Sequence, residues 1–440
     1  MDAFRIQGGS RLTGRMKVDG SKNATLPLMA AALMADGPVR LRRAPELSDI
    51  ANMARLLREL GCDVEGDYGD ITINTIDPTQ THARYDIVRT MRASICVLGP
   101  LLARRKHAAV SMPGGCAFGA RPVDLHLHGL KALGAKIELR GGDIIATADR
   151  LRGATIFLGG SFGTTVLGTA NVMSAATLAH GRTIVESAAC EPEIVDLASM
   201  LNAMGARITG AGTPRITIDG VEQLGGTDHT VMPDRIVAGT YAIAGAITNG
   251  DVTIENFPYD NLLAMVDVCG RMGVHIAMVN PNADPRHCRV RVTCDRHLQP
   301  VMFTTQPYPG FPTDLQAQMM TLLCVANGNS IITEKIYPER FLHVAELGRM
   351  GARLVRAGDT VIVQGVKRLV GAPVMASDLR ASASLILAGL VADGETIVSR
   401  VYHLDRGYTR MDDMLNAVGA NIERFNIDAR ADIAPVAELV

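Results

Sequence analysis

The sequence contains no tryptophan, and aromatic residues make up only 4% of its 440 positions. Extended aromatic platforms, on which proteins stack bases or sugars, are therefore scarce. An excess of charge of one sign is also missing, because 44 lysines and arginines face 45 aspartates and glutamates. Without a strong basic field we expect no nonspecific binding to nucleic acid and no attachment to a membrane surface.

Long hydrophobic runs and paired cysteines are absent as well. The apolar stretch Leu26–Ala35 is too short to span a bilayer, and the N-terminus has no basic segment followed by an apolar run, as a signal peptide would. Eight cysteines are scattered without a CxxC pair, which is typical of a reducing compartment. We therefore expect a cytoplasmic globular protein that is long enough for two or more domains.

The most informative feature is internal repetition. A helix-like phrase that ends in glycine recurs six times, and each copy is followed by an alternating, strand-like run. The six glycines are Gly61, Gly134, Gly205, Gly273, Gly351 and Gly419. A second phrase, an alanine-rich helix followed by glycine and a β-branched run, interleaves with the first. Only the second unit departs from it, with ARRKHAAV where the turn glycine would stand.

Six such units predict an α/β protein built from repeats of about 70 residues. Each repeat would contain strands and two helices, with the alanine-rich helices buried beneath sheets that face outward. Six units divide naturally into three plus three, which predicts two lobes with a ligand-binding cleft between them. We expect the boundary between the third and fourth units near Pro233.

Cations in loop-like contexts are the strongest indication of a ligand site. No Walker-type GxxxxGK[ST] motif is present and no convincing GxGxxG follows a strand, so a phosphate site would need side-chain cations and helix ends. A single surface arginine is usually only solvated, but Lys22 and Arg380 precede corresponding alanine-rich helices in the first and sixth units. Arginine forks suit carboxylates and phosphates, so the ligand is predicted to be a small polyanion. The candidate cations are Lys22, Arg92, Arg121, Arg340, Arg380 and Arg406.

Two further residues are candidates for proton transfer. Cys116 follows two glycines and precedes Arg121, which indicates an electropositive loop where a thiol could act as nucleophile or proton donor; the alternative is an inert core cysteine. Asp314 follows Pro312 and Thr313 at a predicted helix start. It either caps that helix or serves as a base that accepts a hydroxyl proton.

Two histidine-containing runs resemble metal sites only superficially. Asp124, His126 and His128 alternate as they would on a strand, and a second cluster lies between His287 and His297. Neither spacing matches a common zinc site, so both runs are interpreted as ordinary strands and no metal is predicted.

Several longer motifs place these residues in a familiar order: SKNATLP, YDIVRTMRAS, PGGCAFGARPVDLHL, EPEIVD, MPDRIVAGTY, FPTDLQAQ, ERFLHV, ASDLRASAS and YHLDRGY. From FRIQGGSRLTG to HLDRGYTRMDDML, the chain resembles the UDP-N-acetylglucosamine 1-carboxyvinyltransferases, a family of enolpyruvyl transferases. The related EPSP synthases share the architecture and the donor phosphoenolpyruvate, but the PGGC loop is not one of their hallmarks. The resemblance implies a two-domain inside-out α/β barrel with three repeats per domain, residues 22–232 forming one domain and residues 1–21 with 233–440 the other.

The resemblance also implies a reaction. The enolpyruvyl group of phosphoenolpyruvate would move to the 3-hydroxyl of UDP-N-acetylglucosamine with release of phosphate, the first committed step of peptidoglycan synthesis. Both substrates are small molecules, and neither a metal nor an organic cofactor is needed.

Site residues carry over by matching position. Cys116 matches the proton donor to the methylene carbon of phosphoenolpyruvate, which can also form a covalent adduct and is alkylated by fosfomycin. Asn23 and Asp314 both match groups near the sugar hydroxyl, and Asp314 would be the base. Lys22, Arg121 and Arg406 match cations that bind phosphoenolpyruvate, and Arg340 and Arg380 match further cations of the site. The matches to UDP-N-acetylglucosamine contacts are Arg92, Arg121, Pro122, Val123, Asp124, Leu125, Gly163, Thr164, Thr165, Val166 and Ile336.

Some positions depart from the family pattern. Ser48 and Gly163 stand where lysine is common, and Cys190 stands where arginine is usual, so the affinity for the sugar nucleotide does not follow from the resemblance. The tail beyond Glu423 exceeds the usual end of the family and has no assigned role. Two alternatives stay open, a paralogue that uses another acceptor and a catalytically silent protein that binds the sugar nucleotide. Retention of Cys116, Asp314 and Lys22 together with the arginines favours catalysis.

Overall fold

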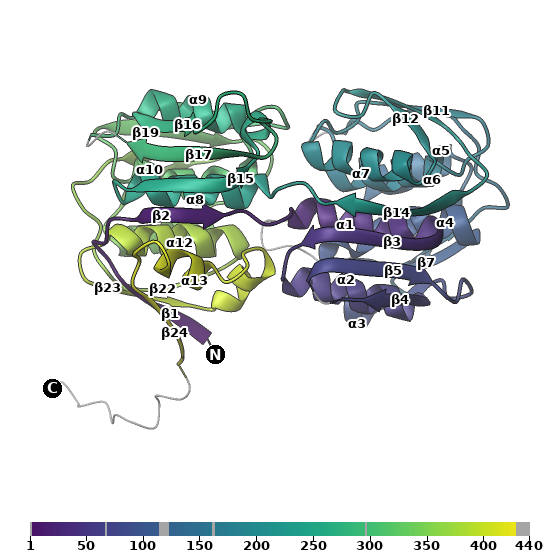
Figure 1. Cartoon of the computed structure of the whole chain (residues 1–440), viewed down its shortest axis with the longest axis horizontal. Helices are drawn as coiled ribbons and strands as arrows, with labels where there is room; N and C mark the ends of the chain where they lie inside the picture. Colours follow the sequence, from purple (N-terminus) through teal and green to yellow (C-terminus); the bar gives the residue numbers. More distant parts are fainter. Residues whose placement is uncertain (1, 67, 114–122, 161–162, 295–296, 428–440) are drawn as a thin grey trace. The chain divides into compact units, whose positions relative to one another are not determined.

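The protein is described by a computed structural model that covers residues 2–66, 68–113, 123–160, 163–294 and 297–427. The chain forms two compact units (Figure 1). Unit 1 comprises Met1–Val18, Arg235–Gln306 and Gly310–Val440, and unit 2 comprises Asp19–Asp234 with Pro307–Pro309. The expected limits, 22–232 against 1–21 with 233–440, lie within a few residues of these, but the small insertion of Pro307–Pro309 into unit 2 was not expected.

Each unit contains three four-stranded sheets, and in every sheet one outer pair of strands is parallel while the other two pairs are antiparallel. In unit 2 the sheet orders are β14-β3-β5-β4, β6-β7-β9-β8 and β10-β11-β13-β12. Their strands are β3 (Ala35–Ala44), β4 (Cys62–Glu65), β5 (Gly69–Thr75), β6 (His82–Ala83), β7 (His107–Ser111), β8 (Lys136–Arg140), β9 (Asp143–Thr147), β10 (Thr155–Phe157), β11 (Arg182–Glu186), β12 (Arg207–Thr209), β13 (Arg215–Asp219) and β14 (Leu224–Thr230).

In unit 1 the orders are β16-β17-β15-β2, β18-β19-β21-β20 and β22-β23-β1-β24. Their strands are β1 (Asp2–Gln7), β2 (Thr13–Lys17), β15 (Asp251–Phe257), β16 (Val274–Met278), β17 (Cys288–Cys294), β18 (Met302–Thr305), β19 (Asn329–Glu334), β20 (Arg353–Ala357), β21 (Thr360–Gln364), β22 (Pro373–Met375), β23 (Glu395–Ser399) and β24 (Ile422–Asn426). The six repeats predicted from the sequence are therefore confirmed.

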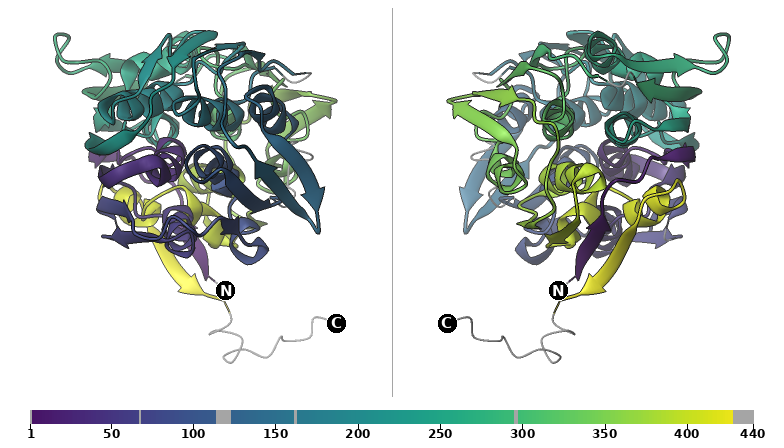
Figure 2. Two further views of the ribbon diagram at one scale, coloured as in Figure 1. Left: turned by 90° about the vertical axis from the view of Figure 1, so that its right-hand side faces the viewer. Right: turned by 90° about the vertical axis from the view of Figure 1, so that its left-hand side faces the viewer.

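Each repeat follows the order strand, inner helix, strand, outer helix and two further strands. The second, third and fifth repeats are continuous in sequence, whereas the other three borrow one strand from elsewhere in the chain. In unit 2, β14 completes the sheet of the first repeat. In unit 1, β2 and β1 complete the sheets of the fourth and sixth repeats, and Figure 2 shows β1 beside β24, where Ala3 faces Phe425. This strand exchange is the reason why the N-terminal residues belong to unit 1.

The inner helices form the centre of each unit (Figure 1). They are α1 (Lys22–Ala31), α4 (Leu98–Arg105) and α6 (Val166–Ala176) in unit 2, and α8 (Arg235–Ile247), α10 (Gln316–Leu323) and α12 (Leu379–Val391) in unit 1. Nearly every residue of α6, α8 and α12 is buried, as expected for a helix that is apolar on all sides. Small residues allow close packing: a Cβ at Gly99 of α4 would lie 2.3 Å from the Asn171 carbonyl oxygen of α6.

The outer helices bury only one face. They are α2 (Ser48–Glu59), α5 (Asp124–Ala132) and α7 (Pro192–Ala203) in unit 2, and α9 (Leu263–Met272), α11 (Leu342–Arg349) and α13 (Met411–Asn416) in unit 1. The repeated glycine after each of them has a positive φ, between 80° and 106°, as a left-handed helix end requires. None of the described helices combines the length and the apolar character needed to cross a bilayer.

Candidate active site

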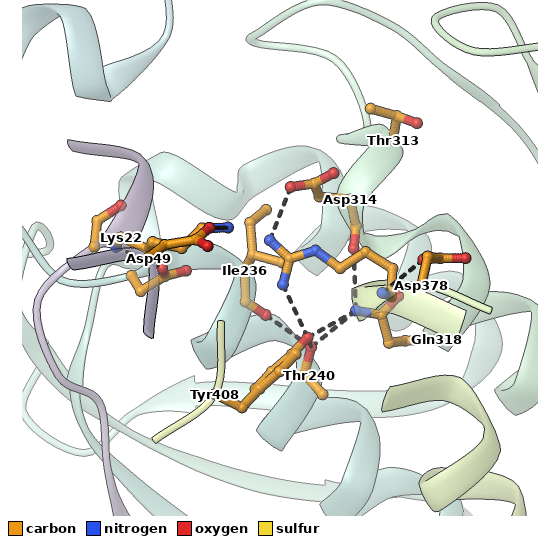
Figure 3. Close-up of polar contacts among 12 residues, drawn as sticks. Lys22, Asp49, Ile236, Thr240, Thr313, Asp314, Gln318, Asp378 and Tyr408 are labelled. Atoms are coloured by element: carbon orange, nitrogen blue, oxygen red, sulfur yellow. Dashed lines mark hydrogen bonds and ion pairs between the residues drawn. The ribbon is translucent and has the colours of Figure 1, made fainter. Parts of the chain in front are cut away.

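Asp314 lies between two arginines in unit 1. It belongs to the short 3-10 helix η4 (Thr313–Leu315), which leads directly into the inner helix α10. Arg340 Nη1 donates to its Oδ1 at 2.7 Å, and Arg380 Nη2 donates to its Oδ2 at 2.8 Å. The carboxylate thus serves as an ionic partner for two buried guanidinium groups. It does not cap a helix, because neither η4 nor α10 has a side-chain cap among the described residues. Figure 3 shows Asp314 within this polar cluster.

The two arginines determine the acidity of Asp314. Burial by itself would raise the pKa of this carboxyl group, because the charged form loses its water. The positive charges and hydrogen bonds of Arg380 and Arg340 outweigh burial and hold the pKa well below its usual value. In the geometry observed, Asp314 is therefore ionised at neutral pH and is only weakly basic.

A second, fully buried carboxylate holds Arg340 in place indirectly. Glu334, the last residue of β19, accepts hydrogen bonds from the Thr305 hydroxyl at 2.8 Å and from the Thr313 hydroxyl at 2.9 Å. It also accepts from the backbone N–H groups of Ile336 and Tyr337, at 2.8 and 2.9 Å. Thr313 in turn accepts from Arg340 Nη1 at 3.0 Å. The predicted contact Ile336 is thus fixed by the same carboxylate that orients the neighbour of Asp314.

Arg380 stands in the first turn of α12. Asp378 caps this helix by accepting from the N–H groups of Arg380 and Ala381 at 2.8 and 3.0 Å. The expected combination of a cation with a helix N-terminus is therefore present here. Arg406, the last residue of the 3-10 helix η5 (Val401–Arg406), lies in unit 1 as well.

Lys22 opens helix α1 in unit 2, at the position that corresponds to the start of α12. Ser21 caps the helix, and the backbone N–H of Lys22 donates to Asp234 Oδ2 at 3.1 Å. The ammonium group forms an ion pair with the buried Asp49 at 3.3 Å. Asn23, the next residue, is partly exposed.

Asn171 of α6 contacts three other segments, two of which carry predicted sugar-nucleotide contacts. Its amide group donates to the Ile95 carbonyl at 2.7 Å, lies 2.9 Å from His126 Nδ1 and accepts from the Gly99 N–H at 2.7 Å. Ile95 belongs to the 3-10 helix η2 (Arg92–Val97), which begins with the predicted contact Arg92. Burial, followed by the charge of Arg92, lowers the pKa of His126 to about 3, so this ring is neutral at pH 7.

The run Asp124–His128 is helical, so its interpretation as a strand is wrong. Helix α5 buries His126, Gly129 and Leu130, and Leu133 follows one turn later; this three- and four-residue spacing is that of a helix rather than a strand. The second histidine-containing run does include a strand, β17. In the described part of the chain, no group of three or more histidine, cysteine or acidic residues is arranged to hold a metal ion.

The other predicted contacts in unit 2 lie at the starts of two helices. Val123, Asp124 and Leu125 begin α5, and Thr164, Thr165 and Val166 lead into α6, where Thr165 accepts from the Gly168 N–H at 3.1 Å. Gly163 has a φ of 88°, a conformation that suits glycine. Cys116, Arg121 and Pro122 lie outside the described residues.

Like Gly163, the other two departures from the family pattern lie in unit 2. Ser48 is the first residue of α2, directly before the Lys22 partner Asp49. Cys190 is half-buried, and its thiol lies 3.7 Å from the Ala188 carbonyl oxygen. Neither side chain offers the positive charge that the family pattern places there.

Several polar residues of the site were not predicted from the sequence. Glu334, Tyr408, Gln318 and Asp49 contact predicted residues but carried no signal of their own. Gln318 stands four residues after Asp314, and Tyr408 stands two residues after Arg406 in the YHLDRGY motif. For Gln318 and Tyr408, the short distance in sequence from a candidate residue was the one indication that they belong to the site.

Comparison with known proteins identifies the family of the chain. The family model described as EPSP synthase (3-phosphoshikimate 1-carboxyvinyltransferase) matches residues 6–415. A UDP-N-acetylglucosamine 1-carboxyvinyltransferase of Geobacter metallireducens is 52% identical, with 96% of this chain and 99% of the relative covered. A protein of Carboxydothermus hydrogenoformans named UDP-N-acetylglucosamine 1-carboxyvinyltransferase 2 is 50% identical, with 97% and 100% covered.

A solved structure is similar over nearly the whole chain. The enolpyruvyl transferase NikO from Streptomyces tendae superposes with a TM-score of 0.85 at 26% identity, covering 96% of this chain and 99% of NikO. The chain therefore belongs to the carboxyvinyltransferase family, together with the UDP-N-acetylglucosamine 1-carboxyvinyltransferases to which it is half identical.

Proposed function

We propose that the protein transfers the enolpyruvyl group of phosphoenolpyruvate to the 3-hydroxyl of UDP-N-acetylglucosamine, the first committed step of peptidoglycan synthesis. The observation that carries this proposal is identity of about half of all residues, over nearly the full length of both chains, with relatives that bear the name of this activity. Phosphoenolpyruvate and the sugar nucleotide are both polyanions, which suits a site rich in buried arginines.

The proposed chemistry needs one acid and one base. A proton from the Cys116 thiol adds to the methylene carbon of phosphoenolpyruvate, and the sugar 3-oxygen bonds to the adjacent cationic carbon while Asp314 accepts the hydroxyl proton. The Cys116 thiolate then takes a proton from the new methyl group, the double bond returns, and the carbon–oxygen bond to phosphate breaks; the leaving phosphate takes the proton that Asp314 accepted. Acid and base assistance of this kind each contribute about 10²–10⁴-fold.

The cations have separate tasks in this proposal. Lys22, Arg121 and Arg406 bind the phosphate and carboxylate of the donor, while Arg340 and Arg380 balance negative charge near Asp314. Arg92, Val123–Leu125, Gly163–Val166 and Ile336 contact the sugar nucleotide, with Arg121 and Pro122. Asn23 orients the acceptor hydroxyl.

The low pKa of Asp314 gives the bound substrates a role in activating the base. With both arginines on its oxygens, the carboxylate attracts a proton only weakly. An anionic substrate that draws either guanidinium group toward itself would raise the pKa of Asp314 and make it a stronger base. Proton removal from the acceptor hydroxyl would then depend on the anionic groups of the bound substrates.

Phosphate release tests the function directly. The protein is mixed with phosphoenolpyruvate and UDP-N-acetylglucosamine, and inorganic phosphate is measured; Asp314→Asn serves as the inactive control. Parallel reactions contain UMP or shikimate 3-phosphate, because the matching family model is described by the latter acceptor. The proposal is supported if phosphate is released from phosphoenolpyruvate with UDP-N-acetylglucosamine as the acceptor and not with UMP or shikimate 3-phosphate. It is rejected if phosphate is released only with another acceptor. Calorimetric binding of the sugar nucleotide without any release would indicate a silent binding protein.

A further inference from the structure

A buried polar cluster lies behind Asp314 in unit 1, on the side away from its carboxylate oxygens. Its centre is the hydroxyl group of Tyr408, a side chain that is 1% exposed. This oxygen lies 2.8 Å from Thr240 Oγ1 of α8, 3.1 Å from Gln318 Nε2 of α10 and 3.1 Å from Arg380 Nη1 of α12. Figure 3 shows Tyr408, Thr240 and Gln318 converging from these elements below Asp314. One hydroxyl group therefore connects all three inner helices of unit 1.

The direction of each hydrogen bond follows from the available protons. Thr240 donates its hydroxyl proton to the Ile236 carbonyl at 2.8 Å, so Tyr408 donates to Thr240. Gln318 Nε2 must face this way because it also donates to the Asp314 carbonyl oxygen at 3.0 Å. Its second N–H group is shared between Thr240 Oγ1 and the Tyr408 oxygen, both at 3.1 Å, and the Tyr408 oxygen also accepts from Arg380. Thr240 and Gln318 thus fix the orientation of the Tyr408 hydroxyl group independently of Arg380.

The planar shape of a guanidinium group transmits this orientation. Arg380 donates through Nη1 to Tyr408 and through Nη2 to Asp314 Oδ2. Because both nitrogens lie in one rigid plane, fixing Nη1 restricts the direction in which Nη2 points. The ring of Tyr408 also lies beside Arg380, with the guanidinium carbon 5.5 Å from the ring centroid. The contact with the ring would survive removal of the hydroxyl group. A variant without the hydroxyl group therefore separates the effect of the hydrogen bond on Arg380 from the effect of the ring.

We infer that Tyr408 is a positioning residue, whose hydroxyl group, held by Thr240 and Gln318, directs Arg380 toward Asp314. The inference rests on the proposed function, in which Asp314 accepts the proton of the acceptor hydroxyl. Without the hydroxyl group, Arg380 keeps its place in the core, but its Nη2 group is no longer aimed at one carboxylate oxygen. Asp314 then changes both its position and its basicity.

The charged groups around Asp314 define how this change appears in a pH profile. Arg340 and Arg380 contact the carboxylate itself, and Asp378 acts on Arg340 from the start of α12. His343 of α11 also lies near Arg340 and Asp378, but burial lowers its pKa to about 4. A weaker hold by Arg380 raises the pKa of Asp314, so the acidic limb of kcat against pH moves to higher pH.

The test compares Tyr408→Phe with Tyr402→Phe. Both variants lose one hydroxyl group; Tyr402 belongs to the adjacent helix η5, is half exposed and has its ring 4.3 Å from that of His403. We expect Tyr408→Phe to lower kcat by about 10- to 100-fold, since a misplacement of about 1 Å can cost about 10² in rate. The KM of this variant for UDP-N-acetylglucosamine should stay within about twofold of the wild-type value. The acidic limb of its profile of kcat against pH should move to higher pH. Tyr402→Phe should match the wild type. A Tyr408→Phe enzyme with unchanged kcat and an unchanged acidic limb overturns the inference.

A second pair of variants covers the case in which Tyr408→Phe folds poorly. Thr240→Val removes the acceptor for the Tyr408 proton at nearly constant volume, whereas Thr240→Ser retains it. We expect Thr240→Val to show part of the loss of kcat that Tyr408→Phe shows. Thr240→Ser should keep wild-type activity. The double variant Tyr408→Phe/Thr240→Val should be no slower than Tyr408→Phe, because both changes act through one hydroxyl group. Equal activity of the valine and serine variants contradicts the inference.

Failure of the proposed function is recognised separately. If the wild type releases no phosphate with any acceptor, the function is wrong, and the inference is then judged from crystal structures of the wild type and Tyr408→Phe. Loss of the 2.8 Å contact between Arg380 Nη2 and Asp314 Oδ2 in the variant alone supports the positioning role. Retention of that contact rejects it.

Discussion

At the scale of single residues, the protein joins one carboxylate to two buried guanidinium groups. Arg340 and Arg380 are nearly inaccessible to solvent, with side chains 6% and 4% exposed. Two buried cations without an anion would be costly, so Asp314 contributes to folding as well as to the proposed chemistry. A substitution at this position should therefore change stability and turnover together.

Asp314→Asn should lower the free energy of unfolding at pH 7 by about 3 kcal/mol, because it removes the negative charge that both buried arginines contact. The pKa of Asp314 in the fold is below its unfolded value. Its ionised form thus stabilises the protein above the unfolded pKa of about 4, and this contribution is lost as the pH falls through the folded pKa. Urea unfolding between pH 3 and 8 should show the two proteins converging toward acid. A pH-independent difference would contradict this account.

Cys116 lies outside the described residues, and its proposed role rests on its motif. Cys116→Ser should lose most turnover, because serine is too weak an acid to protonate a carbon atom, and the loss is expected to be about 10²–10⁴-fold. Cys116→Asp should retain part of the activity, since a carboxylic acid can donate a proton. Phosphate release at several pH values provides the measurement. Equal losses in both variants would argue against proton donation by the thiol.

At the scale of elements, the second repeat lacks the glycine that follows the inner helix in the other five repeats. The turn glycine is replaced in the second repeat by Lys106, which ends α4 with a φ of 61°. The corresponding glycines Gly181 and Gly394 have φ values of 91° and 90°. The second repeat thus has the left-handed conformation that the third and sixth repeats show at this point, although lysine disfavours it.

Lys106→Gly should stabilise the protein by about 0.5–1 kcal/mol, because relief of left-handed strain exceeds the added entropy of the unfolded chain. Lys131→Gly is the matched control, since this lysine is exposed but lies within helix α5. There the same substitution should destabilise by about 1 kcal/mol. Thermal or urea unfolding measures both changes. A destabilised Lys106→Gly protein would show that the turn imposes no strain on lysine.

At the scale of the whole molecule, the described residues form two hydrophobic cores. The core of unit 2 draws on residues between Ala24 and Val231, and the core of unit 1 draws on Phe4–Val18 and Ile236–Ile422. No buried residue belongs to both clusters. Each unit therefore buries its inner helices with its own sheets.

Separate cores predict separate responses to cavities. Leu101 of α4 and Leu385 of α12 are fully buried in different units, and substitution of either by alanine should cost about 2–5 kcal/mol. Hydrogen exchange followed by mass spectrometry should show lost protection in unit 2 for Leu101→Ala and in unit 1 for Leu385→Ala. Equal loss in both units for either variant would mean that the chain unfolds as one cooperative body.

Repetition made much of the fold predictable. Glycines at a regular interval and alternating apolar runs are local signals, and they indicated six units, buried alanine-rich helices and helix ends of left-handed conformation. Local patterns failed at Asp124–His128, where a two-residue alternation is compatible with a strand and with a helix. They also could not reveal that β14, β2 and β1 complete sheets of distant repeats, because strand pairing depends on contacts between segments far apart in sequence.

The sequence by itself determined the repeat architecture, the family and the identity of the candidate acid, base and cations, because each of these is carried by residue type and spacing. Only the tertiary structure decided which of them touch. Asp314, Arg340 and Arg380 stand far apart along the chain and meet because η4, α12 and the segment before α11 pack around one core. The same packing brings Tyr408, Thr240 and Gln318 behind Arg380, a connection that no local motif encodes.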